Sequence, residues 1–285
     1  MTNFSALLYK CSICPRNCNV NRLKNELGFC KIGKNPKISA YNLHFGEEPP
    51  ISGYNGSGTI FFTGCNLRCV FCQNYPISQL YHGNEVTVEK LSEIMLKLQN
   101  QNAHNINLVT PTHVIAQIAE AILLAKREGL KIPVVYNSGG YEKVETLKLL
   151  DGFIDIYMPD AKYSDDKIAE KYSDAKNYWD INKKALKEMY RQVGDLQIKN
   201  GVAVKGLLIR HLVLPDNIAG SKKVFEFIAT ELSKKTYLSI MAQYHPANRT
   251  DEFPELQRKI TDKEYSQVLN RADEFGLTYG WRQEL

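Results

Sequence analysis

The sequence predicts an α/β fold: a parallel sheet that curls into a barrel or partial barrel, with helices on its outside. Short β-branched runs alternate with stretches whose apolar residues recur every three or four positions. Six such strand–helix units follow one another, and parallel strands need crossovers of this kind. Right-handed crossovers would curl the sheet. In such folds the chemistry takes place at the carboxyl ends of the strands.

Each predicted strand is followed by one or two predicted helices. The strands are expected at 59–62, 106–109, 133–136, 154–158, 207–214 and 237–242. The helices are expected at 87–100, 112–128, 142–150, 166–172, 181–193, 221–234 and 262–275. The helix over 112–128 stops at Gly129, a residue that commonly follows a helix end.

The composition excludes several classes of protein. Of the 285 residues, 44% are apolar and 24% charged, so the chain can bury a large core and is not disordered throughout. The net charge of +5 is spread along the chain, and no basic stripe with interleaved aromatic residues indicates a nucleic-acid groove. No apolar run approaches the ~18 residues that cross a bilayer, and residues 1–10 lack the features of a signal peptide. We therefore expect a cytoplasmic protein that binds neither a membrane nor nucleic acid.

Seven cysteines are an odd number, which argues against a complete set of disulfides. In the reducing cytoplasm cysteines more often bind metal or do chemistry. They form two groups: Cys11, Cys14, Cys18 and Cys30, then Cys65, Cys69 and Cys72. We expect residues 1–58 to be an N-terminal metal-binding extension and linker, and residues 59–285 to be the barrel.

The second group has the spacing C-x3-C-x2-C directly after the first predicted strand. A four-iron cluster offers four metal positions, so three local thiolates would leave one iron open for chemistry. A zinc ion completed by a distant histidine, or buried reduced thiols, are the alternatives. The position at the end of a barrel strand favours the cluster.

The first group has the spacing C-x2-C-x3-C-x11-C. Four thiolates within twenty residues suit a closed tetrahedral zinc site, and they equally suit a second cluster with every iron bound. Free or redox-active thiols are a third alternative, and the spacing does not choose among the three.

The segment CNLRCVFC, residues 65–72, resembles the cluster loop of the radical S-adenosylmethionine (SAM) superfamily. With HNINLVTPTHV (104–114), VYNSGGYE (135–142) and LIRHLVLP (208–215), the chain as a whole is similar to an uncharacterised branch related to pyruvate formate-lyase activating enzymes. The resemblance implies a partial (β/α)6 barrel of the radical SAM type with an N-terminal cysteine-rich extension. It covers nearly the whole chain.

The resemblance also implies a mechanism. SAM would chelate the open iron of a [4Fe-4S] cluster held by Cys65, Cys69 and Cys72, and an electron from a flavodoxin- or ferredoxin-type donor would cleave it. The resulting 5′-deoxyadenosyl radical would remove hydrogen from a protein or peptide substrate. The cofactors would carry the difficult step, and the protein would orient them and exclude water.

Polar residues at the predicted strand ends are the candidates for binding SAM. The pattern of the family implies this role for Phe71 and Asn74 in the cysteine loop, and for residues after the later strands. These are Thr110, Asn137, Ser138, Asp160, Lys162, Arg210 and His245. Asp160 and Lys162 lie on one side of an extended chain, while Arg210 and His211 lie on opposite sides, and we expect Arg210 to face inward.

Each of these residues also has an ordinary structural explanation. The Asn137–Gly140 segment could be a plain glycine turn, Asp160 and Lys162 a salt bridge at the rim, and His245 a packed side chain. After the second strand, activating enzymes have Gly-Gly-Glu to meet the SAM amino group, whereas this chain has Thr110-Pro111-Thr112.

Three functions remain open from the sequence. The first is an activating enzyme that removes hydrogen from a residue of a protein partner. The second is a radical SAM enzyme that modifies a ribosomal peptide or a small molecule. The third is an iron–sulfur or zinc interaction module without enzymatic activity.

Overall fold

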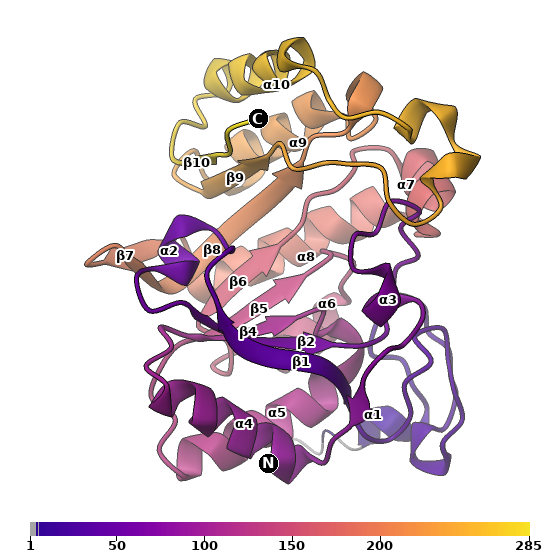
Figure 1. The fold of residues 1–285 in the computed structure, drawn as a ribbon, viewed down its shortest axis with the longest axis vertical. Coiled ribbons are helices and arrows are strands. Elements are labelled where there is room, and N and C mark those ends of the chain that lie inside the picture. Colours follow the sequence, from indigo (N-terminus) through magenta and orange to yellow (C-terminus); the bar gives the residue numbers. More distant parts are fainter. Residues whose placement is uncertain (1–3, 5) are drawn as a thin grey trace.

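The computed structural model describes residue 4 and residues 6–285. A large sheet has the strand order β10-β9-β8-β6-β5-β4-β2-β1-β3, and β7 pairs with β8 (Figure 1). The strands are β1 (Lys37–His44), β2 (Ser57–Phe62), β3 (Asn84–Glu85), β4 (Ile106–Val109), β5 (Val134–Ser138), β6 (Ile156–Pro159), β7 (Gln197–Lys199), β8 (Val202–Leu212), β9 (Tyr237–Met241) and β10 (Gly280–Arg282).

The six strands β2, β4, β5, β6, β8 and β9 pair in parallel, and they are the six that the sequence predicts. The prediction of a parallel α/β sheet is therefore confirmed. Strand β1 extends one edge in the antiparallel direction and was not predicted. Most of its side chains are at least partly exposed, so β1 lacks the alternation of apolar residues that marks a half-buried strand.

The helices lie along the outside of the sheet, below, behind and above it in the view of Figure 1. The longer ones are α4 (Val88–Asn100), α5 (Ile115–Arg127), α7 (Asp166–Ser173), α8 (Tyr178–Val193) and α10 (Asp262–Glu274). The shorter ones are α1 (Ala6–Tyr9), α2 (Pro49–Ser52), α3 (Tyr75–Ser78), α6 (Val144–Lys148) and α9 (Ser221–Phe227). Single turns include η1 (Arg22–Lys24) and η2 (Thr112–Val114), and α9 continues into a π-helical turn, η4 (Ile228–Leu232). None of the helices in the described part of the chain is both long and apolar enough to span a bilayer.

The sheet separates two buried apolar layers. Tyr157 belongs to the outer layer, between sheet and helices, whereas its neighbours Ile156 and Met158 belong to a smaller inner layer. Side chains along a strand point alternately to its two faces. A residue an even number of positions away from an inner-layer residue of the same strand therefore also faces the interior of the barrel. Asp160, the residue directly after β6, faces the interior by this rule, and so do Arg210 on β8 and Asn137 on β5.

The N-terminal segment packs on the side to which the parallel strands point. In Figure 1 its loops lie beside α3, near the carboxyl ends of the strands. The chain then crosses the edge of the sheet as β1 and enters α2 above the inner face. Residues 6–56 thus supply both a cysteine-rich segment and the strand β1.

Candidate active site

The loop after β2 carries Cys65, Cys69 and Cys72, and we call residues 63–74 the three-cysteine loop. All three thiols are free of disulfides. They lie close enough for the charges of Cys69 and Cys72 to act on Cys65. They also belong to or pack against one buried apolar cluster.

Each of the three sulfur atoms has at least one hydrogen-bond partner. The backbone N–H of Leu67 donates to Cys65 Sγ at 3.3 Å, and the hydroxyl of Ser173 donates to Cys69 Sγ at 3.0 Å. Ser78 Oγ lies 3.2 Å from Cys72 Sγ. Hydrogen bonds to sulfur are one means by which a protein tunes the potential of an iron–sulfur cluster.

Backbone contacts hold the three-cysteine loop in place. The N–H groups of Arg68 and Val70 donate to the carbonyls of Ser173 and Tyr172 at the end of α7, both at 2.9 Å. At Gly64 the backbone has a φ of +75°, and a Cβ there would lie 2.6 Å from the Cys30 carbonyl oxygen. Only glycine fits both the conformation and the contact.

A network of charged side chains lies inside the barrel near this loop. Arg210 donates from Nε to Asp160 at 2.9 Å and from Nη2 to Asn137 Oδ1 at 2.7 Å. Lys162 Nζ donates to the other oxygen of Asp160 at 2.6 Å. Burial alone would raise the pKa of Asp160, but Arg210 and Lys162 hold this pKa below its usual value.

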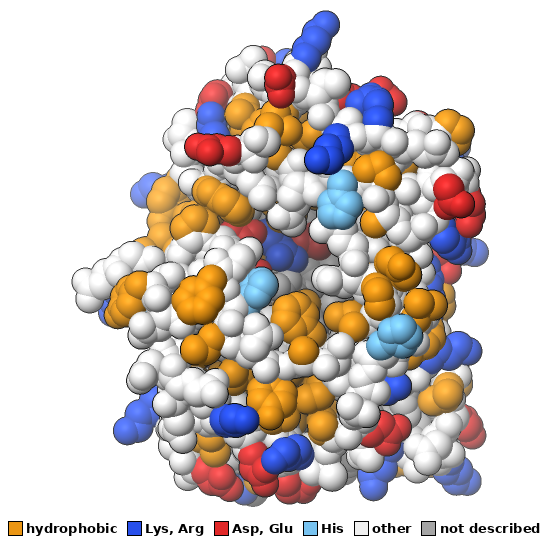
Figure 2. All heavy atoms as spheres, in the orientation of Figure 1, with side chains coloured by type: hydrophobic (Ala, Val, Ile, Leu, Met, Phe, Trp, Pro, Cys, Tyr) orange, Lys and Arg blue, Asp and Glu red, His pale blue; other side chains and the backbone are white. Residues whose placement is uncertain are grey.

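A fifth member of the network comes from the N-terminal segment. Glu47, just before α2, lies 3.8 Å from Arg210 Nη1 and accepts a hydrogen bond from Asn107 Nδ2 at 2.9 Å. Burial raises the pKa of Glu47 to about 7, although Arg210 opposes the rise. Sequence reasoning missed Glu47, because an acidic residue in a linker carries no signal that it enters the barrel. Figure 2 shows a hollow on this face, with basic and acidic side chains inside it.

The charged network reaches the three-cysteine loop through Lys162, whose positive charge acts on Cys69. The glycine turn after β5 packs between them: a Cβ at Gly139 would touch Leu67 and approach Lys162. Gly140 has a φ of +72°, and a Cβ there would collide with the Asp160 carbonyl oxygen. The turn thus needs glycine for close approach to the site.

The other predicted site residues lie at varying distance from this network. Phe71 is buried and meets Tyr163 and Tyr244 edge to face. His245 is exposed, and its Nδ1 lies 3.1 Å from Nε2 of Gln73 in the three-cysteine loop. Asn74 is exposed at the start of α3, and its side chain does not cap that helix.

Ser138 faces the outer side of the sheet, where it contacts Glu142. Glu142 is buried and accepts hydrogen bonds from Thr112 Oγ1 at 2.7 Å and Tyr136 OH at 3.0 Å. Burial raises the pKa of Glu142 to about 7, although these hydroxyls oppose the rise. His211 also faces outward, between the Ala161 carbonyl oxygen and the Ser221 hydroxyl.

Thr110 has a left-handed backbone, with a φ of +60°. This conformation is unusual for a β-branched residue and indicates strain. Its N–H donates to the Asn137 carbonyl at 2.9 Å, which ties the end of β4 to the end of β5. The backbone at Thr110 thus adopts a conformation that glycine prefers.

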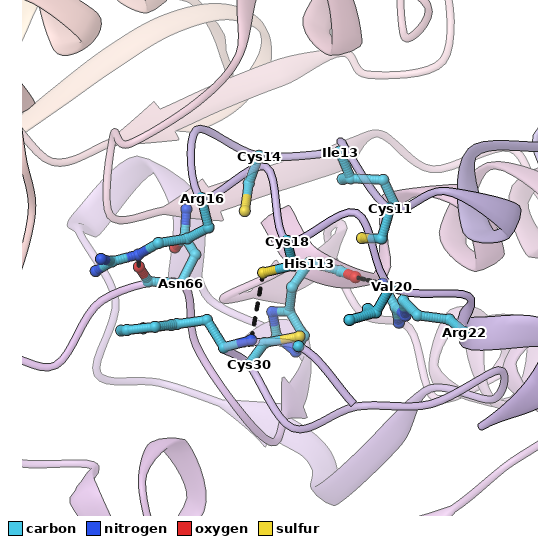
Figure 3. Close-up of a pocket in the computed structure, with 12 residues that line it drawn as sticks. Cys11, Ile13, Cys14, Arg16, Cys18, Val20, Arg22, Cys30, Asn66 and His113 are labelled. Atoms are coloured by element: carbon cyan, nitrogen blue, oxygen red, sulfur yellow. Dashed lines mark hydrogen bonds between the residues drawn. The ribbon is translucent and has the colours of Figure 1, made fainter. Parts of the chain in front are cut away.

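The four N-terminal cysteines line one small cavity, which we call the four-cysteine pocket (Figure 3). Arg22, His113 and Asn66 line it too. Across residue 4 and residues 6–285, no three His, Cys, Asp or Glu side chains are arranged to hold a single metal ion. In a four-iron cluster the cysteines bind different irons and stay further apart than ligands that share one ion.

The four-cysteine pocket adjoins the three-cysteine loop. Arg16 Nε donates to the Asn66 carbonyl at 2.8 Å, and Arg68 donates to the Phe29 carbonyl. The Phe29 ring lies 3.6 Å from the guanidinium carbon of Arg16 and 4.2 Å from that of Arg68. One cation–π contact, between Arg68 and Phe29, and two hydrogen bonds therefore join the segments.

The sequence profile of the radical SAM superfamily matches residues 59–212, from β2 through β8. The chain belongs to the radical SAM superfamily. The chain is also 34% identical over 277 residues to "Uncharacterized protein MJ0674" of Methanocaldococcus jannaschii, which covers 94% of this chain and 75% of that protein. Radical SAM enzymes use SAM and a [4Fe-4S] cluster, so this chain is a SAM-dependent enzyme of that class.

Solved radical SAM structures have a similar fold. The FeFe-hydrogenase maturase HydG from Carboxydothermus hydrogenoformans superposes with a TM-score of 0.53 at 12% identity, over 78% of this chain and 52% of that one. Streptococcus suis SuiB gives a TM-score of 0.53 at 13% identity, over 80% and 48%. The chain spans about half the length of these structures. The predicted partial (β/α)6 barrel with an N-terminal cysteine-rich extension is thus confirmed.

The three-cysteine loop fits a [4Fe-4S] cluster by the chemistry of its donors. Cys65, Cys69 and Cys72 are free thiols at the mouth of the barrel, and each sulfur already has a hydrogen-bond partner. Burial raises the pKa of Cys65 to about 12, so this thiol holds its proton until a cation replaces it.

Proposed function

We propose that this chain cleaves SAM at a [4Fe-4S] cluster bound by Cys65, Cys69 and Cys72. When bound, the cluster and SAM together supply a 5′-deoxyadenosyl radical that removes a hydrogen atom from a substrate. The observation that carries the proposal is the charged network of Asp160 and Arg210. Lys162 binds Asp160 and also lies close enough to Cys69 for its charge to act on that thiol.

The residues of the network suit the polar end of SAM. Lys162 and Arg210 provide fixed positive charge for a carboxylate, and Asp160 and Asn137 provide oxygens for an ammonium group. Phe71, Asn74, Thr110, Ser138 and His245 remain further candidates for contacts with SAM. Asp160 already orients both cations, so little rearrangement is needed on binding.

We infer that the substrate is a residue of a protein or peptide, as in an activating enzyme. Figures 1 and 2 together support this, because the hollow lies between α2 and α3 and apolar side chains surround it. Phe45 and Tyr54 beside α2 are 63% and 75% exposed, and Leu80 after α3 is 54% exposed. Large exposed apolar side chains at a site entrance favour a macromolecular partner.

We also infer two accessory features. The cysteines of the four-cysteine pocket hold a zinc ion or a second iron–sulfur cluster, since all four line one cavity. An acidic flavodoxin or ferredoxin supplies the electron, since the chain carries a net charge of +5. We expect the reaction to take place in the cytoplasm. We also expect residues 1–58 to serve as the metal-binding extension of the barrel over residues 59–285.

The test is anaerobic turnover with dithionite and SAM, followed by chromatography for 5′-deoxyadenosine. The wild-type chain should form it, and Cys65→Ser, Cys69→Ser and Cys72→Ser should not. Cys11→Ser should mainly lower stability and keep some cleavage. The proposal fails if the wild-type chain binds iron and sulfide yet makes no 5′-deoxyadenosine.

The substrate class needs a separate readout. Turnover with cell extract from the source organism, followed by electron paramagnetic resonance, should detect a radical on a protein. Formation of 5′-deoxyadenosine with a radical on no protein, and with a modified small molecule instead, would contradict the activating role.

A further inference from the structure

Arg22 is a buried cation without an acidic partner. Its side chain is 1% exposed, on the short helix η1. Nε donates to the Gly33 carbonyl at 3.0 Å and Nη1 to the His113 carbonyl at 2.6 Å. Nη2 has no partner, and no carboxylate of residue 4 or residues 6–285 pairs with the guanidinium. A buried charge without a counter-charge is strongly unfavourable.

The four-cysteine pocket is where Arg22 faces other ionisable groups. Arg22 lines this cavity together with Cys11, Cys14, Cys18 and Cys30 (Figure 3), and its charge acts on Cys30. A second polar group in the lining also lacks a partner. His113 is 2% exposed, and its Nδ1 makes no hydrogen bond.

Metal binding would supply the missing negative charge. Four thiolates around one Zn²⁺ leave two negative charges, and four thiolates on an oxidised [4Fe-4S]²⁺ core leave the same two. Neutral thiols would leave two arginines and no negative charge in the lining: Arg22 has no acidic partner in the described part of the chain, whereas Arg16 pairs with Asp174 at 3.4 Å. We infer that Arg22 is the fixed counter-charge of a dianionic metal–thiolate centre on these four cysteines. This inference rests on the proposed metal binding by the four-cysteine pocket and deepens it.

Arg22 also connects this centre to the three-cysteine loop. Its Nη1 holds the His113 carbonyl, and His113 Nε2 lies 2.7 Å from the carbonyl of Thr63, at the start of that loop. Arg22 is therefore a positioning residue as well as a counter-charge, because the carbonyl that it holds belongs to His113, whose ring contacts the loop that carries Cys65.

The test uses the full chain with Cys65, Cys69 and Cys72 all changed to alanine, so that any remaining metal belongs to the four-cysteine pocket. Into this background we introduce Arg22→Met, which removes the charge, and Arg22→Lys, which keeps it. Lys24→Met is the matched control, because Lys24 is an exposed cation on the same helix. Iron, sulfide and zinc are measured after anaerobic purification, and circular dichroism checks folding.

Loss of metal to excess EDTA should be about 10- to 100-fold faster in Arg22→Met than in Lys24→Met, as for other outer partners of metal sites. Arg22→Lys should restore most of the retention. If the metal is an iron–sulfur cluster, Arg22→Met should also lower its midpoint potential, an effect that loss of packing alone would not produce. Zinc, or iron with sulfide, identifies which centre the pocket holds.

The two inferences fail in different ways. If the background chain is folded but holds neither zinc nor iron, the pocket is not a metal site. If it holds metal and Arg22→Met retains that metal as long as Lys24→Met does, the metal site stands and the role of Arg22 is wrong. If Arg22→Met fails to fold, the test rests on Arg22→Lys. This variant should retain its metal as long as the background chain does, and a much faster loss of metal would contradict the role of Arg22 as counter-charge.

Discussion

Arg210 donates a hydrogen bond from Nε to Asp160 at 2.9 Å, and this ion pair joins β8 to the residue that follows β6 inside the barrel. The side chain of Arg210 is 17% exposed and that of Asp160 10%. Lys162 binds the same carboxylate from its other side. One carboxylate therefore holds two cations in place beside the three-cysteine loop.

The first prediction concerns this carboxylate. Asp160→Asn should weaken SAM binding at least tenfold and lower the free energy of unfolding by about 3 kcal/mol, because two largely buried cations lose their partner. Calorimetric titration with SAM and chemical denaturation measure the two effects. Asp151→Asn is the control, since Asp151 pairs with Arg191 on the surface and both side chains are half exposed. Equal effects of the two substitutions would contradict the prediction.

The second prediction concerns the donor to Cys69. Ser173→Ala should keep the cluster but make it harder to reduce, because the sulfur loses a hydrogen bond that stabilises negative charge. A bond worth about 1 kcal/mol corresponds to a fall of about 40 mV for one electron. A redox titration followed by electron paramagnetic resonance measures the midpoint potential. Ser92→Ala, which removes a buried hydroxyl without a partner, should leave it unchanged.

The third prediction concerns pH. The pKa of Glu142 is raised to about 7 by burial, so the folded chain keeps a proton that the unfolded chain releases near pH 4.5. The contribution of Glu142 to the free energy of unfolding is fully present below about pH 4.5. It is lost as pH rises towards 7, and the total loss is about 3 kcal/mol. Denaturation between pH 4 and pH 8 should therefore show a smaller fall for Glu142→Gln than for the wild-type chain.

The matched control for the pH prediction is Glu145→Gln, at an exposed position on α6. This variant should follow the wild-type curve. Glu47 has a pKa raised in the same way and should account for part of the fall that remains in Glu142→Gln. Parallel curves for wild type and Glu142→Gln would show that Glu142 does not titrate in this range.

The fourth prediction concerns backbone strain at the end of β4. Thr110→Gly should raise the free energy of unfolding by about 1 kcal/mol, because glycine adopts a φ of +60° without the clash of a β-branched side chain. Asn102→Gly is the control, since Asn102 has a φ of +64° but asparagine tolerates that region. Chemical denaturation compares the two, and a destabilised Thr110→Gly would mean that the threonine side chain contributes more than its strain costs.

The barrel was predictable because its signals are local and periodic. Buried strands such as β4 and β5 are short apolar runs, and the helices between them repeat their apolar residues every three or four positions. The same periodicity led to Asp160 and Arg210, since strand ends and the alternation of side chains fix which residues face inward.

Other parts of the site depend on contacts that the sequence does not encode locally. Strand β1 lies beside the short edge strand β3 and has many exposed residues, so it has no clear apolar period. Glu47 and Arg22 look like ordinary surface charges, and only the folded chain buries them. The outward direction of Ser138 follows from the inward direction of Asn137, and the alternation along β5 could have indicated it in advance.

The path of the N-terminal segment limits how this barrel could be shortened or transplanted. A fragment that began at β2 would lose Glu47 and leave Arg210 with fewer oxygens around it. It would also leave the backbone of β2 unpaired along one side, and such a bare border invites association with other chains. Any minimal version intended for protein engineering should therefore begin no later than Lys37, upstream of where the superfamily profile begins.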